Sequence, residues 1–201
     1  MNLIEKAKKV FRKCGGIMRT HEIQASGIHP RTLYTMRDDG SLECISRGVY
    51  RLSELPPLVD PDLARVAMRV PNAVVCLISA LAFHELTTEI PHAVHIALPR
   101  RARYPTIEYP PIRVYLYSNA SFNAGIEEKR IDGVATRVFC AEKTLADCFK
   151  FRNKIGMDVV LEALHTYRLR RGARIQRVLE FARVCRVEKV IRPYLEVIAS
   201  M

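Results

Sequence analysis

Residues 27–52 read GIHPRTLYTMRDDGSLECISRGVYRL, and the first half of this stretch has the pattern of a short helix. Pro30 suits the first helical position, because it has no backbone N–H that would be left unbonded there. Leu33 and Met36 recur at a helical step and form the side that faces a core. We therefore predict a helix that begins at Pro30 and is closed by residues 38–40.

The second half of the stretch predicts two short strands, at residues 42–45 and 49–52, joined by a turn that contains Gly48. Upstream, apolar residues recur every three or four positions over residues 3–14, which predicts an amphipathic helix. Thr20 carries the hydroxyl of an N-cap and predicts a further short helix. Three helices followed by a hairpin is the order of a winged helix-turn-helix, whose last helix enters the major groove of DNA.

The side of the third helix that points away from its apolar residues supplies candidate DNA contacts. Arg31 lies near the N-terminal end that a recognition helix presents to bases, and an arginine can pair bidentately with guanine. Threonine and tyrosine can reach phosphate or a thymine methyl group. The predicted DNA-binding residues are Thr20, Arg31, Thr32, Tyr34, Thr35 and Arg47. The alternative is a helical protein-interaction module in which these are ordinary surface residues and Arg47 is a solvated turn residue.

Prolines at positions 56, 57 and 61 interrupt the pattern after the hairpin, and we predict a linker over residues 55–62. This gives a DNA-binding domain over residues 1–55 and a second domain over residues 63–201. The fold class is therefore α+β, with an N-terminal winged helix-turn-helix followed by a mixed α/β C-terminal domain that has a helical C-terminal end.

The second domain alternates between helical and strand patterns. Helices are expected near residues 62–70, 80–86, 145–149, 159–167, 175–185 and 187–198, and strands near residues 95–98, 113–117, 128–131 and 134–139. Residues 74–77 fit either a strand or the start of a helix that Ser79 caps. Asp132 and Gly133 form a hairpin turn in this prediction, and Pro193 weakens or kinks the last helix.

The chain has a formal net charge of +11, which makes nucleic acid or an acidic protein a natural partner. The excess is largest in residues 151–201, which carry 11 basic and 5 acidic side chains. The predicted DNA-binding or partner-binding basic face consists of Arg170, Arg171, Arg174 and Arg177. The alternative is a solvated face. Because the apolar stripe of this helix does not include these arginines, reversing their charges is expected to leave the fold intact.

No catalytic residue, metal ligand or cofactor site is predicted. His84, Glu85, His92 and His95 are the one local cluster of metal-type side chains, and they lack the H-E-x-x-H spacing that brings two imidazoles onto one helical face. The six cysteines form no C-x-x-C pair and are expected to be free, buried thiols. The longest apolar stretch, residues 73–83, is too short to span a bilayer, and the N-terminus lacks a secretory pattern, so we expect a cytoplasmic protein with no membrane partner.

Several stretches together resemble one family. They are GI at residues 27–28, LY at 33–34, RGVYRL at 47–52, CLISALAFHELT at 76–87 and AEKTLADCFKFR at 141–152, followed by Gly156. In this order they resemble AbiEi-type antitoxins, the abortive-infection transcriptional regulators of type IV toxin–antitoxin systems. The resemblance covers nearly the whole chain. One departure is Glu85, where glycine is more common in the family.

The resemblance implies two activities within a phage-defence system. The N-terminal domain would repress its own operon by binding repeats in the promoter, and the C-terminal domain would support neutralisation of a nucleotidyltransferase-like toxin. Two other classes stay open: a transcription factor whose C-terminal domain senses a ligand, and a nucleic-acid-processing enzyme with an unrecognised site. A neighbouring nucleotidyltransferase gene would favour the antitoxin, whereas a solitary gene with an unrelated target promoter would favour the ligand-responsive regulator.

Overall fold

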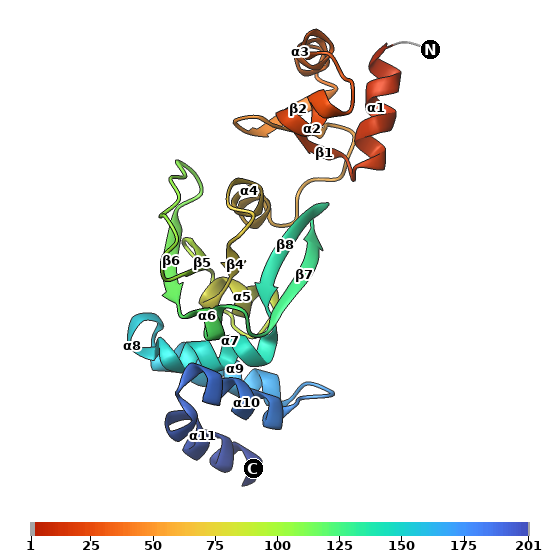
Figure 1. Ribbon diagram of the computed structural model, residues 1–201. Coiled ribbons are helices and arrows are strands. Elements are labelled where there is room, and N and C mark those ends of the chain that lie inside the picture. The colour runs from red at the N-terminus through yellow and green to blue at the C-terminus, as the bar shows by residue number, and fades with distance from the viewer. Residues whose placement is uncertain (1–2, 201) are drawn as a thin grey trace. The chain divides into compact units, whose positions relative to one another are not determined.

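The computed structural model describes residues 3–200, which form two compact units (Figure 1). Unit 1 contains the residues up to Met68 together with Arg130–Ala135. Unit 2 contains Arg69–Lys129 and the residues from Thr136 onward. The fold class is α+β, as predicted, with a winged helix-turn-helix in unit 1, a mixed sheet in unit 2 and helices at the C-terminal end. Within residues 3–200, no helix combines the length and the apolar character that crossing a bilayer requires.

Unit 1 has the predicted order of three helices and a hairpin. Its elements are α1 (Leu3–Lys13), β1 (Ile17–Arg19), α2 (Thr20–Ala25), α3 (Pro30–Asp38), β2 (Leu42–Ser46), β3 (Val49–Leu52) and α4 (Pro61–Arg69). The strands form an antiparallel sheet in the order β1-β3-β2. Phe11, Ile23, Leu33 and Met36 are buried beneath this sheet in one core, which fixes how the three helices pack.

Three details of unit 1 differ from the prediction. Strand β1 was missed, because three residues are too few to show an alternating pattern. Thr20 is the first residue of α2, and Arg19 is its N-cap, so the predicted cap was wrong by one position. Pro61, which we placed in the linker, opens α4, since a proline fits the first turn of a helix as well as it fits a linker.

Unit 2 is built on a five-stranded mixed sheet. Its strands are β4 (Val74–Val75), β5 (Val94–Pro99), β6 (Ile112–Tyr117), β7 (Ile126–Ile131) and β8 (Val134–Phe139), of which β7 and β8 end in unit 1 at their shared turn. The strand order is β6-β5-β4-β8-β7, with β4 antiparallel to β5 and parallel to β8. Asp132 and Gly133 both have positive φ angles, which confirms the predicted hairpin turn between β7 and β8.

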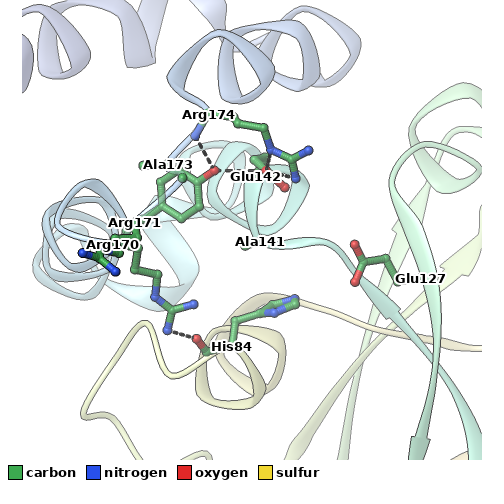
Figure 2. Close-up of a pocket in the computed structure, with 10 residues that line it drawn as sticks. His84, Glu127, Ala141, Glu142, Arg170, Arg171, Ala173 and Arg174 are labelled. Atoms are coloured by element: carbon green, nitrogen blue, oxygen red, sulfur yellow. Dashed lines mark hydrogen bonds and ion pairs between the residues drawn. The ribbon is translucent and has the colours of Figure 1, made fainter.

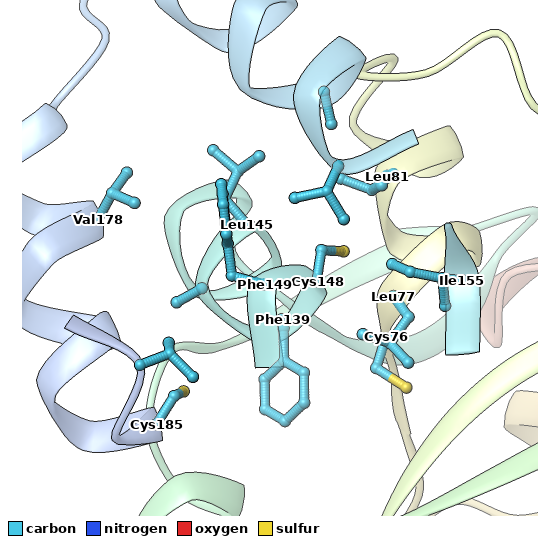
Figure 3. Close-up of a cluster of buried hydrophobic side chains, with 14 of the residues drawn as sticks. Cys76, Leu77, Leu81, Phe139, Leu145, Cys148, Phe149, Ile155, Val178 and Cys185 are labelled. Carbon is cyan, nitrogen blue, oxygen red and sulfur yellow. The ribbon is translucent and has the colours of Figure 1, made fainter. Parts of the chain in front are cut away.

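The helices of unit 2 bury one another around α7. They are α5 (Leu77–Phe83), α6 (Asn119–Phe122), α7 (Ala141–Lys150), α8 (Arg152–Ile155), α9 (Met157–Arg168), α10 (Ile175–Cys185) and α11 (Glu188–Ser200). Leu145, Cys148 and Phe149 of α7 lie inside the cluster drawn in Figure 3, where Val178 of α10 also packs. The predicted helix near residue 187 is confirmed and continues through Pro193. Ser79 lies inside α5 rather than at its start, and its hydroxyl accepts a hydrogen bond from the backbone N–H of His95 at 2.9 Å.

The cysteines divide into two groups. Cys76, Cys140, Cys148 and Cys185 are buried, as expected, and burial raises the pKa of the Cys140 thiol to about 11 and that of Cys185 to about 12. The other two, at positions 14 and 44, are exposed, so the expectation that all six thiols are buried was wrong. Cys14 follows the last residue of α1, and Cys44 faces outward on β2, where neither position belongs to a core-facing stripe.

Candidate nucleic-acid interface

The helix-turn-helix of unit 1 is held by local hydrogen bonds and by one buried side chain on each side of the turn. After α2 the Ser26 hydroxyl donates to the backbone carbonyl of Ile23 at 2.7 Å, and the N–H of Ile28 donates to the same carbonyl at 3.2 Å. Gly27 between them has a φ of +81°, a conformation that glycine adopts without strain. Ile23 and Ile28 are buried, so the turn has a fixed geometry that sets the direction of α3.

The start of α3 is capped by a histidine that the sequence analysis did not single out. His29 precedes Pro30, and its Nδ1 atom accepts a hydrogen bond from the backbone N–H of Arg31 at 3.1 Å. This bond satisfies one N–H of the first turn, and Pro30 has none to satisfy. The backbone at the N-terminal end of α3 is therefore ordered before any ligand arrives.

The exposed face of α3 carries the predicted polar residues. Leu33 and Met36 are buried, as predicted, while Arg31, Tyr34 and Thr35 are exposed and Thr32 is half-buried. Within residues 3–200, the Arg31 guanidinium has no ion-pair or hydrogen-bond partner. The face thus presents a positive charge at the end of the helix where a recognition helix contacts bases.

The last turn of α3 holds a second arginine, whose guanidinium is paired. The Arg37 guanidinium donates to the carboxylate of Asp38 at 2.7 Å and lies 5.2 Å from the centre of the Tyr34 ring. The hydrogen bond to Asp38 keeps the pKa of Arg37 above its ordinary value. Arg37 is therefore neutralised on the surface, in contrast to Arg31.

The wing consists of β2, β3 and the turn that contains the exposed Arg47 and Gly48. The Thr20 hydroxyl donates to the carbonyl of Gly48 at 3.1 Å, and the Thr20 N–H donates to the same oxygen at 2.9 Å. Arg65 of α4 donates from Nε to the carbonyl of Ile45 at 3.0 Å. Thr20 thus fastens the wing turn to the start of α2, a contact over 28 residues that a linear pattern does not reveal.

Arg51 of β3 is a buried cation that the sequence analysis did not single out. Its guanidinium pairs with the carboxylate of Glu43 on β2 and donates to the backbone carbonyl of Pro56. These contacts fix the segment after the wing to the sheet. Arg51 therefore stabilises unit 1 and is not available to a ligand.

In unit 2 the four predicted basic-face residues have different environments. Arg174 pairs with the buried carboxylate of Glu142 at 2.7 Å, and Arg170 donates to the backbone carbonyl of His84 (Figure 2). Arg170 also donates to the backbone carbonyl of Glu85 at 2.9 Å. Arg171 is exposed, and the Arg177 guanidinium lies 5.7 Å from the centre of the Phe181 ring. The expectation that reversing all four charges leaves the fold intact was wrong, because a carboxylate at position 174 would meet that of Glu142.

The histidines near α5 serve the fold. The Nε2 atom of His84 lies 2.7 Å from the carbonyl of Phe139, and burial lowers the pKa of His84 below its ordinary value. His95 is buried on β5, and burial lowers its pKa to about 4. Across residues 3–200, no three side chains of the His, Cys, Asp or Glu type come together as metal ligands would.

The geometry of unit 1 defines a DNA-binding winged helix-turn-helix of the kind found in transcriptional regulators. Residues 5–53 match the family described as transcriptional regulator, AbiEi antitoxin, and the match extends from α1 to the end of the wing. The predicted resemblance to AbiEi-type antitoxins is confirmed over this segment.

Two further comparisons concern the whole chain. No curated protein matches the sequence. Among solved structures, the crystal structure of the RV2827C protein from Mycobacterium tuberculosis is similar at 15% sequence identity with a TM-score of 0.49, and the similarity covers 91% of this chain and 76% of that chain.

Proposed function

We propose that this protein is an autorepressor that binds repeated sites in its own promoter through α3 and the wing. The proposal rests on the Arg31 guanidinium, which is exposed and has no partner in residues 3–200. It lies at the N-terminal end of α3, and that helix packs into the core of unit 1. An arginine at this position can pair with a guanine in the major groove without first giving up an internal bond.

The other predicted residues have distinct roles in this proposal. Thr32, Tyr34 and Thr35 lie along α3 beside Arg31 and contact phosphate or a thymine methyl group. The Thr35 hydroxyl donates to the carbonyl of Arg31 at 2.9 Å, so it meets DNA as an acceptor. Arg47 at the tip of the wing follows the DNA backbone, and Thr20 holds that tip in place through the Gly48 carbonyl.

We also propose that residues 63–201 counteract a nucleotidyltransferase-like toxin, while residues 1–55 bind DNA. Support for the toxin comes from the antitoxin family that residues 5–53 match and from the resemblance of residues 76–87 and 141–152. The matched family is one of transcriptional regulators, and we assign no catalytic role. The basic face of unit 2 would contact either DNA or a partner.

Point variants of the full chain test this division. The substitution Arg31→Ala should weaken repression of a reporter driven by the native promoter and should leave rescue from the co-expressed toxin unchanged. The matched control is Arg37→Ala on the same helix, which removes a charge already paired with Asp38 and should repress nearly as the native protein does. Equal repression by the Arg31 and Arg37 variants would refute the role of α3 proposed here.

A further inference from the structure

A cavity of about 210 Å³ lies in unit 2 where three arginines meet. Its walls come from the end of α5, the start of α7, β7 and the segment that joins α9 to α10 (Figure 2). The volume is below the roughly 300–1,000 Å³ of pockets that enclose a whole small molecule. It therefore suits a single chemical group that enters from outside.

Arg174 is anchored at this cavity by a buried carboxylate. Its Nε and Nη2 atoms lie 2.9 and 2.7 Å from Oε1 of Glu142, whose side chain is only 4% exposed. The Tyr167 hydroxyl donates to the same oxygen at 3.0 Å and accepts from the backbone N–H of Arg174 at 2.9 Å. Burial opposes the ionisation of Glu142, but these hydrogen bonds and the charge of Arg174 leave its pKa below the ordinary value.

Arg170 is anchored on the opposite wall by backbone carbonyls. Its Nη2 atom donates to the carbonyls of His84 and Glu85, which lie just beyond the end of α5. Glu85 has a φ of +53°, the left-handed conformation that favours the glycine more common in the family. The guanidinium therefore satisfies carbonyls that the helix leaves unbonded, and its position is fixed.

Both anchored arginines keep unused donors. A guanidinium has five N–H donors, and within the described chain Arg174 uses only its Nε and Nη2 atoms and Arg170 only its Nη2 atom. Arg171 lies between them in sequence and is exposed, and no residue of the described chain pairs with its guanidinium. Three guanidinium groups thus line one small cavity, and each keeps N–H donors that no described residue accepts.

The acidic groups at the cavity are already compensated. Glu142 is paired with Arg174, and the carboxylate of Glu127 lies 2.9 Å from the ammonium of Lys129. The cavity also lies beside the first residue of α7 and the N-cap of α10, where the helix dipoles contribute positive potential. Because Arg174 and Lys129 already compensate these carboxylates, the charges of Arg170 and Arg171 leave a net positive field for an entering anion.

The geometry points to a binding site for one phosphate group, held by the unused N–H donors of Arg170, Arg171 and Arg174. Arginine forks match phosphate oxygens bidentately, and anchored forks lose little conformational freedom on binding. The group is either a phosphodiester of nucleic acid or the phosphate of a small molecule. This inference deepens the binding role proposed for the basic face, and it stands apart from repression through α3.

Nuclear magnetic resonance of the full-length protein tests the site directly. Inorganic phosphate, dAMP and a 20-base-pair duplex without promoter sequence are titrated separately at constant ionic strength, while the Nε–Hε signals of the arginines are followed. We expect saturable shifts of the Arg170, Arg171 and Arg174 signals with inorganic phosphate. Shifts of the same signals by the duplex assign the site to nucleic acid, and shifts by dAMP but not by the duplex assign it to a small phosphorylated ligand.

The variant Arg171→Ala should weaken phosphate binding at least tenfold without unfolding the protein, because this side chain has no bond within the described residues. The matched control is Arg103→Ala, which removes an exposed charge of unit 2 outside the cavity. Absence of phosphate-induced shifts, shifts reproduced by sodium chloride, or equal weakening in both variants would overturn the inference. None of these readouts depends on promoter repression.

Discussion

The two units of this protein use their charged side chains in opposite ways. Arg51 is the one buried charged side chain among the described residues of unit 1, whereas unit 2 buries Glu142, Lys143 and Asp147. Unit 1 instead exposes its polar residues on α3 and at the tip of the wing. The polar side chains of unit 1 thus face solvent, where a ligand can contact them. Many of those in unit 2 instead hold its own helices together.

This contrast shows why a count of arginines does not identify a binding face. Arg31 and Arg174 are both exposed cations near a helix N-terminus, yet Arg174 is bonded to a buried carboxylate and Arg31 has no partner in the described residues. Removing Arg174 should disturb the packing of unit 2, whereas removing Arg31 should change only what unit 1 can bind. The following predictions test that difference.

The largest effect is expected at the buried ion pair of α7. The ammonium of Lys143 lies 2.5 Å from the carboxylate of Asp147, and both side chains are fully buried. The substitution Lys143→Met leaves an uncompensated carboxylate in the core and should lower the free energy of unfolding by about 3–5 kcal/mol, measured by urea denaturation.

The control for this prediction removes both charges. The double variant Lys143→Met, Asp147→Leu should recover most of the lost stability, because no isolated charge remains. The Cys185 thiol, which donates to Asp147 at 3.1 Å, loses a weak bond in that variant. If the single variant is as stable as the native protein, the ion pair does not hold α7 in place.

The next largest effect is the pH dependence of stability that His95 of unit 2 causes. Burial lowers the pKa of His95 to about 4, whereas an unfolded histidine titrates near pH 6.5. Between these pH values the histidine is protonated in the unfolded chain but not in the folded chain. The free energy of unfolding therefore falls by up to about 3 kcal/mol as the pH drops from about 6.5 to 4.

The variant His95→Leu should flatten this part of the pH profile, whereas His92→Ala, which changes an exposed histidine, should leave it as in the native protein. Urea denaturation at several pH values between 4 and 7 measures both. Identical profiles for the native protein and the His95 variant would contradict the assignment.

A smaller effect is expected in unit 1, where Thr20 bonds to the wing. The substitution Thr20→Val keeps the shape of the side chain but removes its hydrogen bond to Gly48, and should cost about 1 kcal/mol of stability. It should also weaken DNA binding less than Arg31→Ala does, since it only loosens the wing. A Thr20 variant that loses all affinity while staying folded would make Thr20 a direct DNA contact.

The sequence predicted the elements of unit 1 well because their signals are local. Pro30, Leu33, Met36 and Gly48 each act within a few residues, so the third helix was found with the correct buried side and the wing with its turn at Gly48. The direction of the side chains on α3 followed from the same spacing. The hairpin at Asp132 and Gly133 was found for the same reason.

What the sequence could not predict depends on contacts between distant residues. The bond from Thr20 to Gly48 and the pair of Glu142 with Arg174 join residues 28 and 32 positions apart. Lys143 and Asp147 have the i, i+4 spacing typical of an exposed helical ion pair, and only the packing of α7 shows that they are buried. The cavity in unit 2 is lined by residues from four separate elements, so no short stretch of sequence reveals it.

The central claim is that α3 reads promoter DNA through Arg31, and fluorescence anisotropy with the native promoter and single-base variants tests it most directly. We expect Arg31→Ala to lose about 1–3 kcal/mol of binding free energy and to lose discrimination at one base pair, with the slope of affinity against salt concentration nearly unchanged. Arg37→Ala should keep that discrimination. Retention of full affinity and of discrimination at every base pair by the Arg31 variant would contradict the account.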